Sequence, residues 1–347
     1  MPLLNSMMNL DLFDYNLPGE LIAQHPIYPR DHARLMVVHR DTGCIEHRKF
    51  YNIIEYVKKG DCLVLNNSRV LRARFFGMAD KTQGKREIFL LKSLGDKKWL
   101  ALTNPNKRVH RGDAIIVSKN PEILVKVLEK GSAGENVIEF ESPLPMEKIL
   151  QFGEVPLPPY IKGKATEADY QNLYANLLGS VASATAGLHF TNELLEDLKG
   201  MGVYVAYITL HVGLGTFKPI KENDLNKHKM HSEEFFISEE TANLINNVRK
   251  NGGRIVATGT TVVRTLETAS TREGFLKPMS GATKLFIKPG YPFKIVDMMI
   301  TNFHFPRTTL LALVSAFATR ELIMKAYDIA VQECYRFYSF GDAMLIL

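Results

Sequence analysis

Hydrophobic and polar positions follow three different patterns along the chain. Before about residue 69, short apolar strands alternate with short helical segments. From there to residue 149, short β-rich runs are separated by Gly, Asn, Asp or Lys turns at the spacing typical of a small barrel. Farther along, strands and helices alternate, which indicates an α/β domain with a substantial sheet. The sequence therefore predicts a large mixed-sheet α/β domain, discontinuous over residues 1–68 and 150–347, with an all-β barrel domain inserted at residues 69–149.

A strand-to-helix corner is predicted in RIVATGTTVVRTLET. The strand ends at Gly259, Thr260 or Thr261 can cap the following helix, and Arg264 and Glu267 lie three apart on one helix face. The free amides at such a helix start favour an anion, either a carboxylate or a phosphate. A capped helix with a surface ion pair explains the same residues, so both interpretations stay open.

A second corner is predicted in MITNFHFPRTT, where a strand ends and a long helix starts at Thr308 or Thr309. Asn302 and His304 lie at this corner. The carboxyl end of a sheet strand is where α/β proteins bind ligands, whereas a histidine between two phenylalanines is commonly a packing residue. Earlier in the chain, the pattern over residues 168–179 predicts one more helix.

Residues 180–217 gather hydroxyl groups, glycines and two histidines around a predicted helix start and a predicted strand end. His189 lies in the first half of this stretch, and His211 lies beside Gly213 and Gly215 in the second. Active-site groups tend to collect at such places, which makes the stretch the first candidate site.

Net charge and cysteine content give only weak information about binding partners and cellular compartment. The formal charge of +6 suits a partner that carries phosphates. Arg69, Arg72 and Arg74 form a cluster that could bind phosphate or be an ordinary solvated face, and Arg72 and Arg74 are expected on one face of a strand. The three cysteines are far apart, which fits a reducing cytoplasm, and no apolar run approaches the length that spans a membrane.

The sequence lacks the motifs that mark several common enzyme classes. The chain has no dinucleotide fingerprint, phosphate loop, HExxH motif or nucleophile elbow. His228 and His231 lie three apart near Glu233, but this spacing with no defined third ligand is a weak zinc signal, so no metal is expected.

Nine motifs together closely resemble the QueA family, the S-adenosylmethionine:tRNA ribosyltransferase-isomerases. They are FDYNLPGELIAQHP, RDHARLMVV, PLPPYI, ATAGLHFT, TLHVGLGTFKP, MHSEEF, ATGTTVVRTLE, ITNFHFPRTTLLALVSAFA and YRFYSFGDAML, collinear from about residue 11 to the C-terminus. The resemblance implies a cytoplasmic, monomeric enzyme that acts on tRNA carrying preQ1, a 7-aminomethyl-7-deazaguanine, at the wobble position. S-adenosylmethionine is consumed as a ribosyl donor and no cofactor is needed; the products are epoxyqueuosine, adenine and methionine.

The same resemblance implies roles for particular residues. The ribose C5′ proton must be removed by a base, and adenine leaves more readily when an acid protonates it. His189 and His211 are the leading proton-transfer candidates, with His231, Glu233 and His304 as reserves. The residues expected to bind S-adenosylmethionine are Thr185, Ala186, Gly187, Thr260, Thr261, Arg264, Asn302 and His304, with Arg264 at the carboxylate. Arg69, Arg72 and Arg74 are expected at the tRNA backbone.

Five positions depart from the family pattern. They are Ala33, Asn67, Ser68, Arg72 and Ala184, where relatives commonly have Ser, an acidic residue, Thr, Pro and Pro. A non-catalytic tRNA-binding relative of the same fold is therefore the alternative function. A methyltransferase that uses the same donor is a third hypothesis, and release of adenine distinguishes it from the first.

Overall fold

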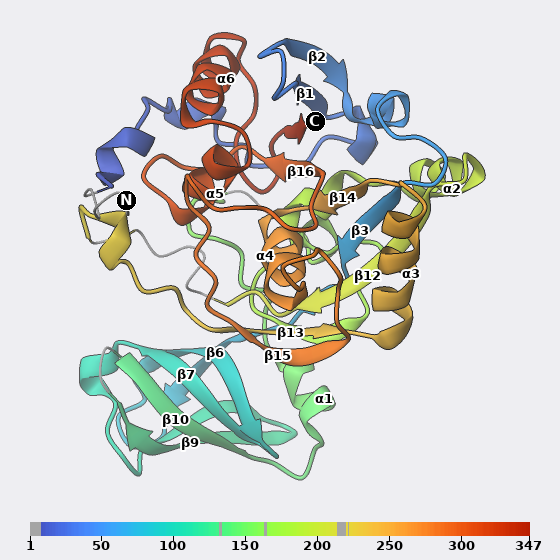
Figure 1. Cartoon of the computed structure of the whole chain (residues 1–347). Coiled ribbons are helices and arrows are strands. Elements are labelled where there is room, and N and C mark those ends of the chain that lie inside the picture. The colour runs from blue at the N-terminus through green and yellow to red at the C-terminus, as the bar shows by residue number, and fades with distance from the viewer. Residues whose placement is uncertain (1–7, 132–133, 163–164, 214–219, 221) are drawn as a thin grey trace. The chain divides into compact units, whose positions relative to one another are not determined.

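The structure, a computed structural model, describes residues 8–131, 134–162, 165–213, 220 and 222–347. The chain forms two compact units. The α/β unit comprises Met1–Arg69, Pro159–Leu177 and Ser183–Leu347, and the barrel unit comprises Val70–Pro158 and Leu178–Ala182. The predicted fold class, a mixed-sheet α/β domain with an inserted all-β barrel, is confirmed (Figure 1).

A nine-stranded mixed sheet organises the α/β unit, in the order β15-β13-β12-β3-β14-β16-β17-β1-β2. Its strands are β1 (Arg34–Val38), β2 (Ile45–Lys49), β3 (Cys62–Asn66), β12 (Tyr204–Leu210), β13 (Glu233–Ile237), β14 (Ile255–Thr258), β15 (Met279–Thr283), β16 (Met298–Asn302) and β17 (Ala343–Ile346). In the centre, β12, β3, β14 and β16 pair in parallel. Their carboxyl ends therefore lie at one edge of the sheet.

Helices complete the α/β unit: α2 (Asn192–Gly200), α3 (Glu239–Lys250), α4 (Thr260–Ala269), α5 (Thr309–Phe317) and α6 (Arg320–Gln332), with the 3-10 helices η4 (Phe50–Glu55) and η9 (Thr185–His189) among the short ones. The apolar face of α2 and residues of η4 pack with β1, β3, β14, β16 and β17 in one buried cluster. Burial of that face explains why the amphipathic α2 forms. Among the described residues, no helix is long and apolar enough to cross a membrane.

Six antiparallel strands close the barrel in the order β10-β7-β6-β5-β8-β9. They are β5 (Arg74–Ala79), β6 (Lys85–Gly95), β7 (Lys98–Asn104), β8 (Ala114–Lys119), β9 (Glu122–Lys130) and β10 (Glu135–Glu141); α1 (Met146–Ile149) follows. In β7 and β10 every second side chain is buried, because successive side chains of a strand point to opposite faces and one face lies inside the barrel. Separately, β4 (Ser68–Val70) and β11 (Leu177–Ser180) form a two-stranded sheet.

The helix predicted over residues 168–179 is wrong. Only a 3-10 turn, η8 (Ala168–Tyr170), forms there, and β11 starts at Leu177. Asn172 donates to the Ala184 carbonyl at 3.2 Å, and Tyr174 packs against Gly187 so closely that a Cβ on Gly187 would lie 1.9 Å from its hydroxyl oxygen. These tertiary contacts override the local helical pattern.

The start of α4 also differs from expectation. Gly259, and neither threonine, is the N-cap, and no side chain caps this helix. The chain turns from β14 into α4 with a φ of 92° at Gly259, a conformation that glycine adopts without strain. By contrast, the hydroxyl of Thr308 caps α5 by accepting from the Leu311 N–H, so the helix begins at Thr309, one of the two predicted starts.

Candidate ligand site at the carboxyl edge of the sheet

A cavity opens where the parallel strands of the α/β unit end. It encloses about 630 Å³ of space, part of it open to solvent. Its lining comes from the ends of β14 and β16, from η9 and from the segments around them. The lining residues are Tyr160, Ser183, Ala184, Thr185, Ala186, Val212, Gly259, Thr260, Thr261, Thr301, Asn302, Phe303, His304, Leu310, Tyr338 and Ser339. Such a position is typical of ligand sites in α/β proteins.

Asn302 is the centre of the polar network behind this cavity. Its Nδ2 donates to the Tyr338 carbonyl at 3.1 Å, which fixes the orientation of the amide, and it lies 3.1 Å from His189 Nε2. Its Oδ1 accepts from the Thr185 hydroxyl at 3.0 Å. The pattern assigns Nε2 of His189 as an acceptor, so this lone pair is already engaged.

His189 does not line the cavity. Its ring is 4% exposed and stacks on Phe50 with the ring centroids 4.9 Å apart. Burial, helped by the positive charges of Arg30 and Arg336, lowers the pKa of His189 to about 3. The imidazole is therefore uncharged at neutral pH and holds Asn302 in place.

His304 lies at the cavity wall. Its Nε2 is 2.9 Å from the Thr301 hydroxyl, which donates to the Asn302 carbonyl and so accepts the Nε2 proton. This assigns Nδ1 as the unprotonated nitrogen, and Nδ1 has no hydrogen-bond partner in the part of the chain that the structure describes. Burial lowers the pKa of His304 to about 3, which keeps the ring neutral.

His211 follows β12 and lies in a different environment. Its Nδ1 is 2.7 Å from the Ser68 hydroxyl, and it lines an open hollow with Glu234 and Phe236, while the next residue, Val212, lines the cavity. Partial burial lowers the pKa of His211, and the Glu234 charge opposes that shift. Of the two leading histidines, His211 is therefore the one that remains accessible.

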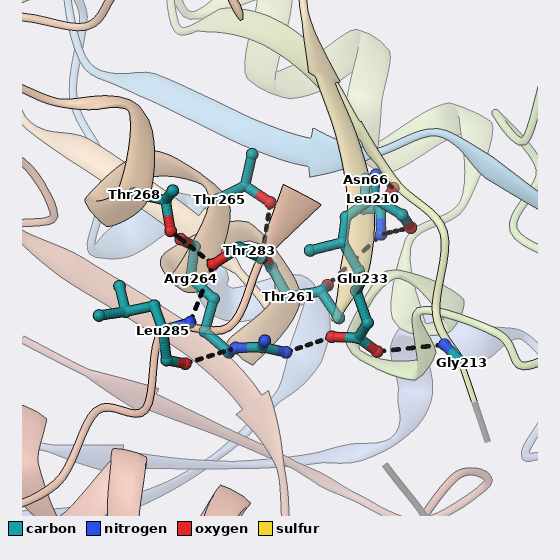
Figure 2. A network of polar contacts seen from close by, with 10 residues as sticks. All are labelled: Asn66, Leu210, Gly213, Glu233, Thr261, Arg264, Thr265, Thr268, Thr283 and Leu285. Atoms are coloured by element: carbon teal, nitrogen blue, oxygen red, sulfur yellow. Dashed lines mark hydrogen bonds and ion pairs between the residues drawn. The ribbon is translucent and has the colours of Figure 1, made fainter. Parts of the chain in front are cut away.

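Glu233 and Arg264 form a buried ion pair (Figure 2). Their side chains are 4% and 6% exposed. Glu233 also accepts from the Gly213 N–H at 3.1 Å, and Arg264 donates to the Leu285 carbonyl at 3.1 Å. The pair thus connects α4 and β13 with the chain just beyond His211.

The surface ion pair expected between Arg264 and Glu267 is therefore wrong. Both residues are buried, at 5% and 1% exposed, and Glu267 accepts from the backbone N–H groups of Lys294 and Ile295. The spacing of three residues does place the two side chains on one helix face. Each of them instead binds a group from another part of the chain, so they do not pair with each other.

Six of the residues predicted to bind S-adenosylmethionine line the cavity, and other predicted residues lie outside it. Thr185, Ala186, Thr260, Thr261, Asn302 and His304 line the cavity, whereas Gly187 is buried beneath it against Tyr174 and His231 is exposed. The structure does not describe Gly215. Among the described residues, no group of three or more His, Cys, Asp or Glu side chains could hold a metal ion.

The three arginines differ in their surroundings. Arg69 is exposed in β4, and Arg72 is exposed but lies outside any strand, so it does not share a strand face with Arg74 as expected. Arg74 is half-buried, and its Nε lies 3.0 Å from the Glu87 carboxylate. Arg69 and Arg72 are thus the exposed members of this set, and the Arg72 guanidinium also donates to the Gln151 carbonyl at 3.1 Å.

Sequence reasoning missed ten of the sixteen cavity residues, among them Tyr160, Ser183, Tyr338 and Ser339. Ser183 precedes the ATAGLHFT motif by one residue, so its position was a usable signal. Tyr338 is held in the cavity wall with a φ of 74°, which a bulky side chain rarely adopts and which no sequence pattern announces.

Together, the sheet edge, the cavity and the inserted barrel define a two-unit α/β protein with a candidate ligand site at the carboxyl edge of its sheet. The chain matches the family described as queuosine biosynthesis protein over residues 10–346, and it belongs to that family. It is 51% identical over 341 residues to the S-adenosylmethionine:tRNA ribosyltransferase-isomerase of Acetivibrio thermocellus, across 98% of this chain and 100% of the relative. It is 50% identical over 337 residues to the protein of the same name from Thermoanaerobacter sp., across 96% and 98%.

A solved structure agrees with this family assignment. The crystal structure of S-adenosylmethionine tRNA ribosyltransferase from Thermotoga maritima matches with a TM-score of 0.57 and 41% identity, across 97% of this chain and 100% of that chain. The likeness covers both the sheet and the barrel segments of the sequence.

Proposed function

We propose that this chain is an S-adenosylmethionine:tRNA ribosyltransferase-isomerase of queuosine biosynthesis. It transfers and isomerises the ribosyl group of S-adenosylmethionine onto the aminomethyl group of preQ1 at the tRNA wobble position, with release of adenine and methionine. The observation that carries the proposal is the identity of 51% along the full length of a relative with this name. A tRNA substrate also implies a cytoplasmic enzyme.

His211 is proposed as a proton-transfer residue. The sulfonium acidifies the ribose C5′ proton, so a base must remove it, and an accessible imidazole suits that step. His211 is held through Nδ1 by Ser68 and is not fully buried, so its other ring nitrogen can meet substrate. An imidazole oriented by a hydroxyl partner is the arrangement that positioned bases commonly have.

His189 is proposed as a positioning residue. It holds Asn302, which in turn holds Thr185 at the cavity wall. Burial lowers the pKa values of His189 and His304, which disfavours the protonated imidazole that an acid needs. His189→Gln should lower turnover through Asn302, and because Gln can still accept the Asn302 N–H, it should retain more activity than His189→Ala.

Arg69 is proposed to contact the tRNA backbone, with Arg72 and Arg74 as weaker candidates because the Gln151 carbonyl and the Glu87 carboxylate already engage them. An unpaired wobble nucleotide needs little unstacking to reach an enzyme site. Binding of an anticodon stem-loop should therefore weaken as salt rises.

The proposal is tested by incubation with S-adenosylmethionine and preQ1-containing tRNA, scored by mass spectrometry. Adenine, methionine and the epoxide nucleoside should appear in equal amounts. His211→Gln should cut turnover far more than tRNA binding. Absence of all three products under saturating conditions, with tRNA binding intact, would contradict the proposal and leave a binding-only protein.

A further inference from the structure

The cavity of the α/β unit has no formally charged wall. None of the described residues that line it is Asp, Glu, Lys or Arg, and its one histidine, His304, is held neutral by burial. Burying a charged group without a counter-charge is costly, and apart from the uncapped backbone N–H groups at the start of α4 the described wall offers a charged ligand no partner of opposite charge. It suits an uncharged ligand that has hydroxyl groups and a planar ring.

Ser183 provides an unsatisfied polar group in this wall. Its side chain is buried, at 7% exposed, and its hydroxyl oxygen has no hydrogen-bond partner among the described residues. Buried hydroxyl groups in folded proteins are almost always hydrogen-bonded. Because Ser183 lines the cavity, a bound ligand can supply the missing partner.

Two tyrosines give the cavity an aromatic side. The rings of Tyr160 and Tyr338 meet edge to face with centroids 4.4 Å apart, and the Tyr160 hydroxyl is fixed 2.6 Å from Ser339 Oγ. Tyr338 keeps its left-handed backbone because its N–H donates to Phe303 and its carbonyl accepts from Asn302, each at 3.1 Å. A strained backbone held by several partners is a common feature of ligand sites.

We propose that this cavity, which we call the nucleoside pocket, binds the uncharged adenosine half of S-adenosylmethionine and excludes the methionine half. The adenine ring contacts the Tyr160 and Tyr338 wall, and Ser183 hydrogen-bonds the nucleoside. Arg264, expected at the methionine carboxylate, does not line the pocket and is neutralised by Glu233, so the carboxylate lies outside it. This inference rests on the proposed function for the identity of the donor.

The probe for this pocket is 5′-methylthioadenosine, which keeps adenine, ribose and thioether but lacks the amino-acid charges. Calorimetric titration of the full chain should show binding whose Kd barely changes with salt, and methionine alone should not compete. Ser183→Ala should raise Kd by about 2- to 12-fold, the equivalent of one hydrogen bond. Its Tm should not fall, because the hydroxyl has no partner in the free protein.

Ser315→Ala is the matched control. Ser315 is also a buried serine without a partner for its hydroxyl, but it lies in α5 and does not line the pocket. It should leave Kd unchanged. Competition by methionine, or an equal Kd for wild type and Ser183→Ala, would overturn the proposal.

Product assays separate this inference from the proposed function. If adenine release with preQ1-containing tRNA is normal while Ser183→Ala binds the probe like wild type, the pocket assignment is wrong and the activity stands. If the probe binds as expected but no product forms, the activity is wrong and the nucleoside pocket stands.

Discussion

The two buried histidines of the α/β unit should make its stability fall in acid. His189 and His304 have pKa values of about 3 in the folded chain, against an ordinary value of 6.5. Below pH 6.5 the unfolded chain takes up protons that the folded chain does not, so the free energy of unfolding decreases as the pH falls from 6.5 towards 3. Well above pH 6.5 both histidines are neutral in the folded and in the unfolded chain, so no stability is lost to their protonation.

The size of the effect follows from the two pKa values. At pH 5.0 an unfolded histidine is about 97% protonated, whereas the buried ring stays neutral. At about 1.36 kcal/mol per pKa unit, each histidine lowers the free energy of unfolding by about 2 kcal/mol between pH 7.5 and pH 5.0. The pair contributes about 4 kcal/mol, a large part of the stability of an ordinary domain.

Urea unfolding, followed by far-UV circular dichroism at pH 7.5 and 5.0, measures this loss. His189→Gln and His304→Gln carry a neutral amide at every pH, so each should show a loss about 2 kcal/mol smaller than wild type. His25→Gln, which replaces an exposed ring, is the control for the substitution itself. If both buried-site variants lose as much stability as wild type on acidification, the rings are not held neutral and the reasoning is refuted.

Three further variants test other contacts. Glu233→Gln leaves the buried guanidinium facing it without its counter-charge, so urea titration should show a loss of about 3 kcal/mol; a loss below about 0.5 kcal/mol would mean that the pair is not coupled. Gly187→Ala puts a Cβ 1.9 Å from the Tyr174 hydroxyl, so its Tm should drop as expected for about 1–3 kcal/mol of overpacking, whereas Gly200→Ala, with open space around it, should keep the wild-type Tm. Arg69→Gln should reduce the slope of log affinity for an anticodon stem-loop against log salt by about 1, and an unchanged slope would remove Arg69 from the tRNA surface.

The fold was largely predictable because its elements carry strong local patterns. In barrel strand β7, buried and more exposed side chains alternate, and in β3 every side chain is buried. Both patterns of burial follow from the order of apolar and polar residues in the sequence. The segment over residues 168–179 was not predictable, because its conformation depends on contacts of Asn172 and Tyr174 with a turn more than ten residues away. Propensity does not contain that information.

The candidate site was predictable where it coincides with strand ends. Thr260 and Asn302 follow or end parallel strands, so the sequence placed them at one edge of the sheet. The partner of Arg264 was not predictable, because Glu233 comes from a different element, strand β13, 31 residues away. The Tyr338 wall was also missed, since it depends on a backbone conformation and on hydrogen bonds to Asn302 and Phe303.

Isotope tracing shows directly whether S-adenosylmethionine donates its ribosyl group or its methyl group to the tRNA. The enzyme is incubated with preQ1-containing tRNA and S-adenosylmethionine that carries one label in the ribose and a second in the methyl group. The ribose label should enter the tRNA nucleoside, while the methyl label leaves with free methionine and adenine is released in equal amount. Methyl label in the tRNA together with S-adenosylhomocysteine, or no label in the tRNA at all, would contradict the proposed reaction.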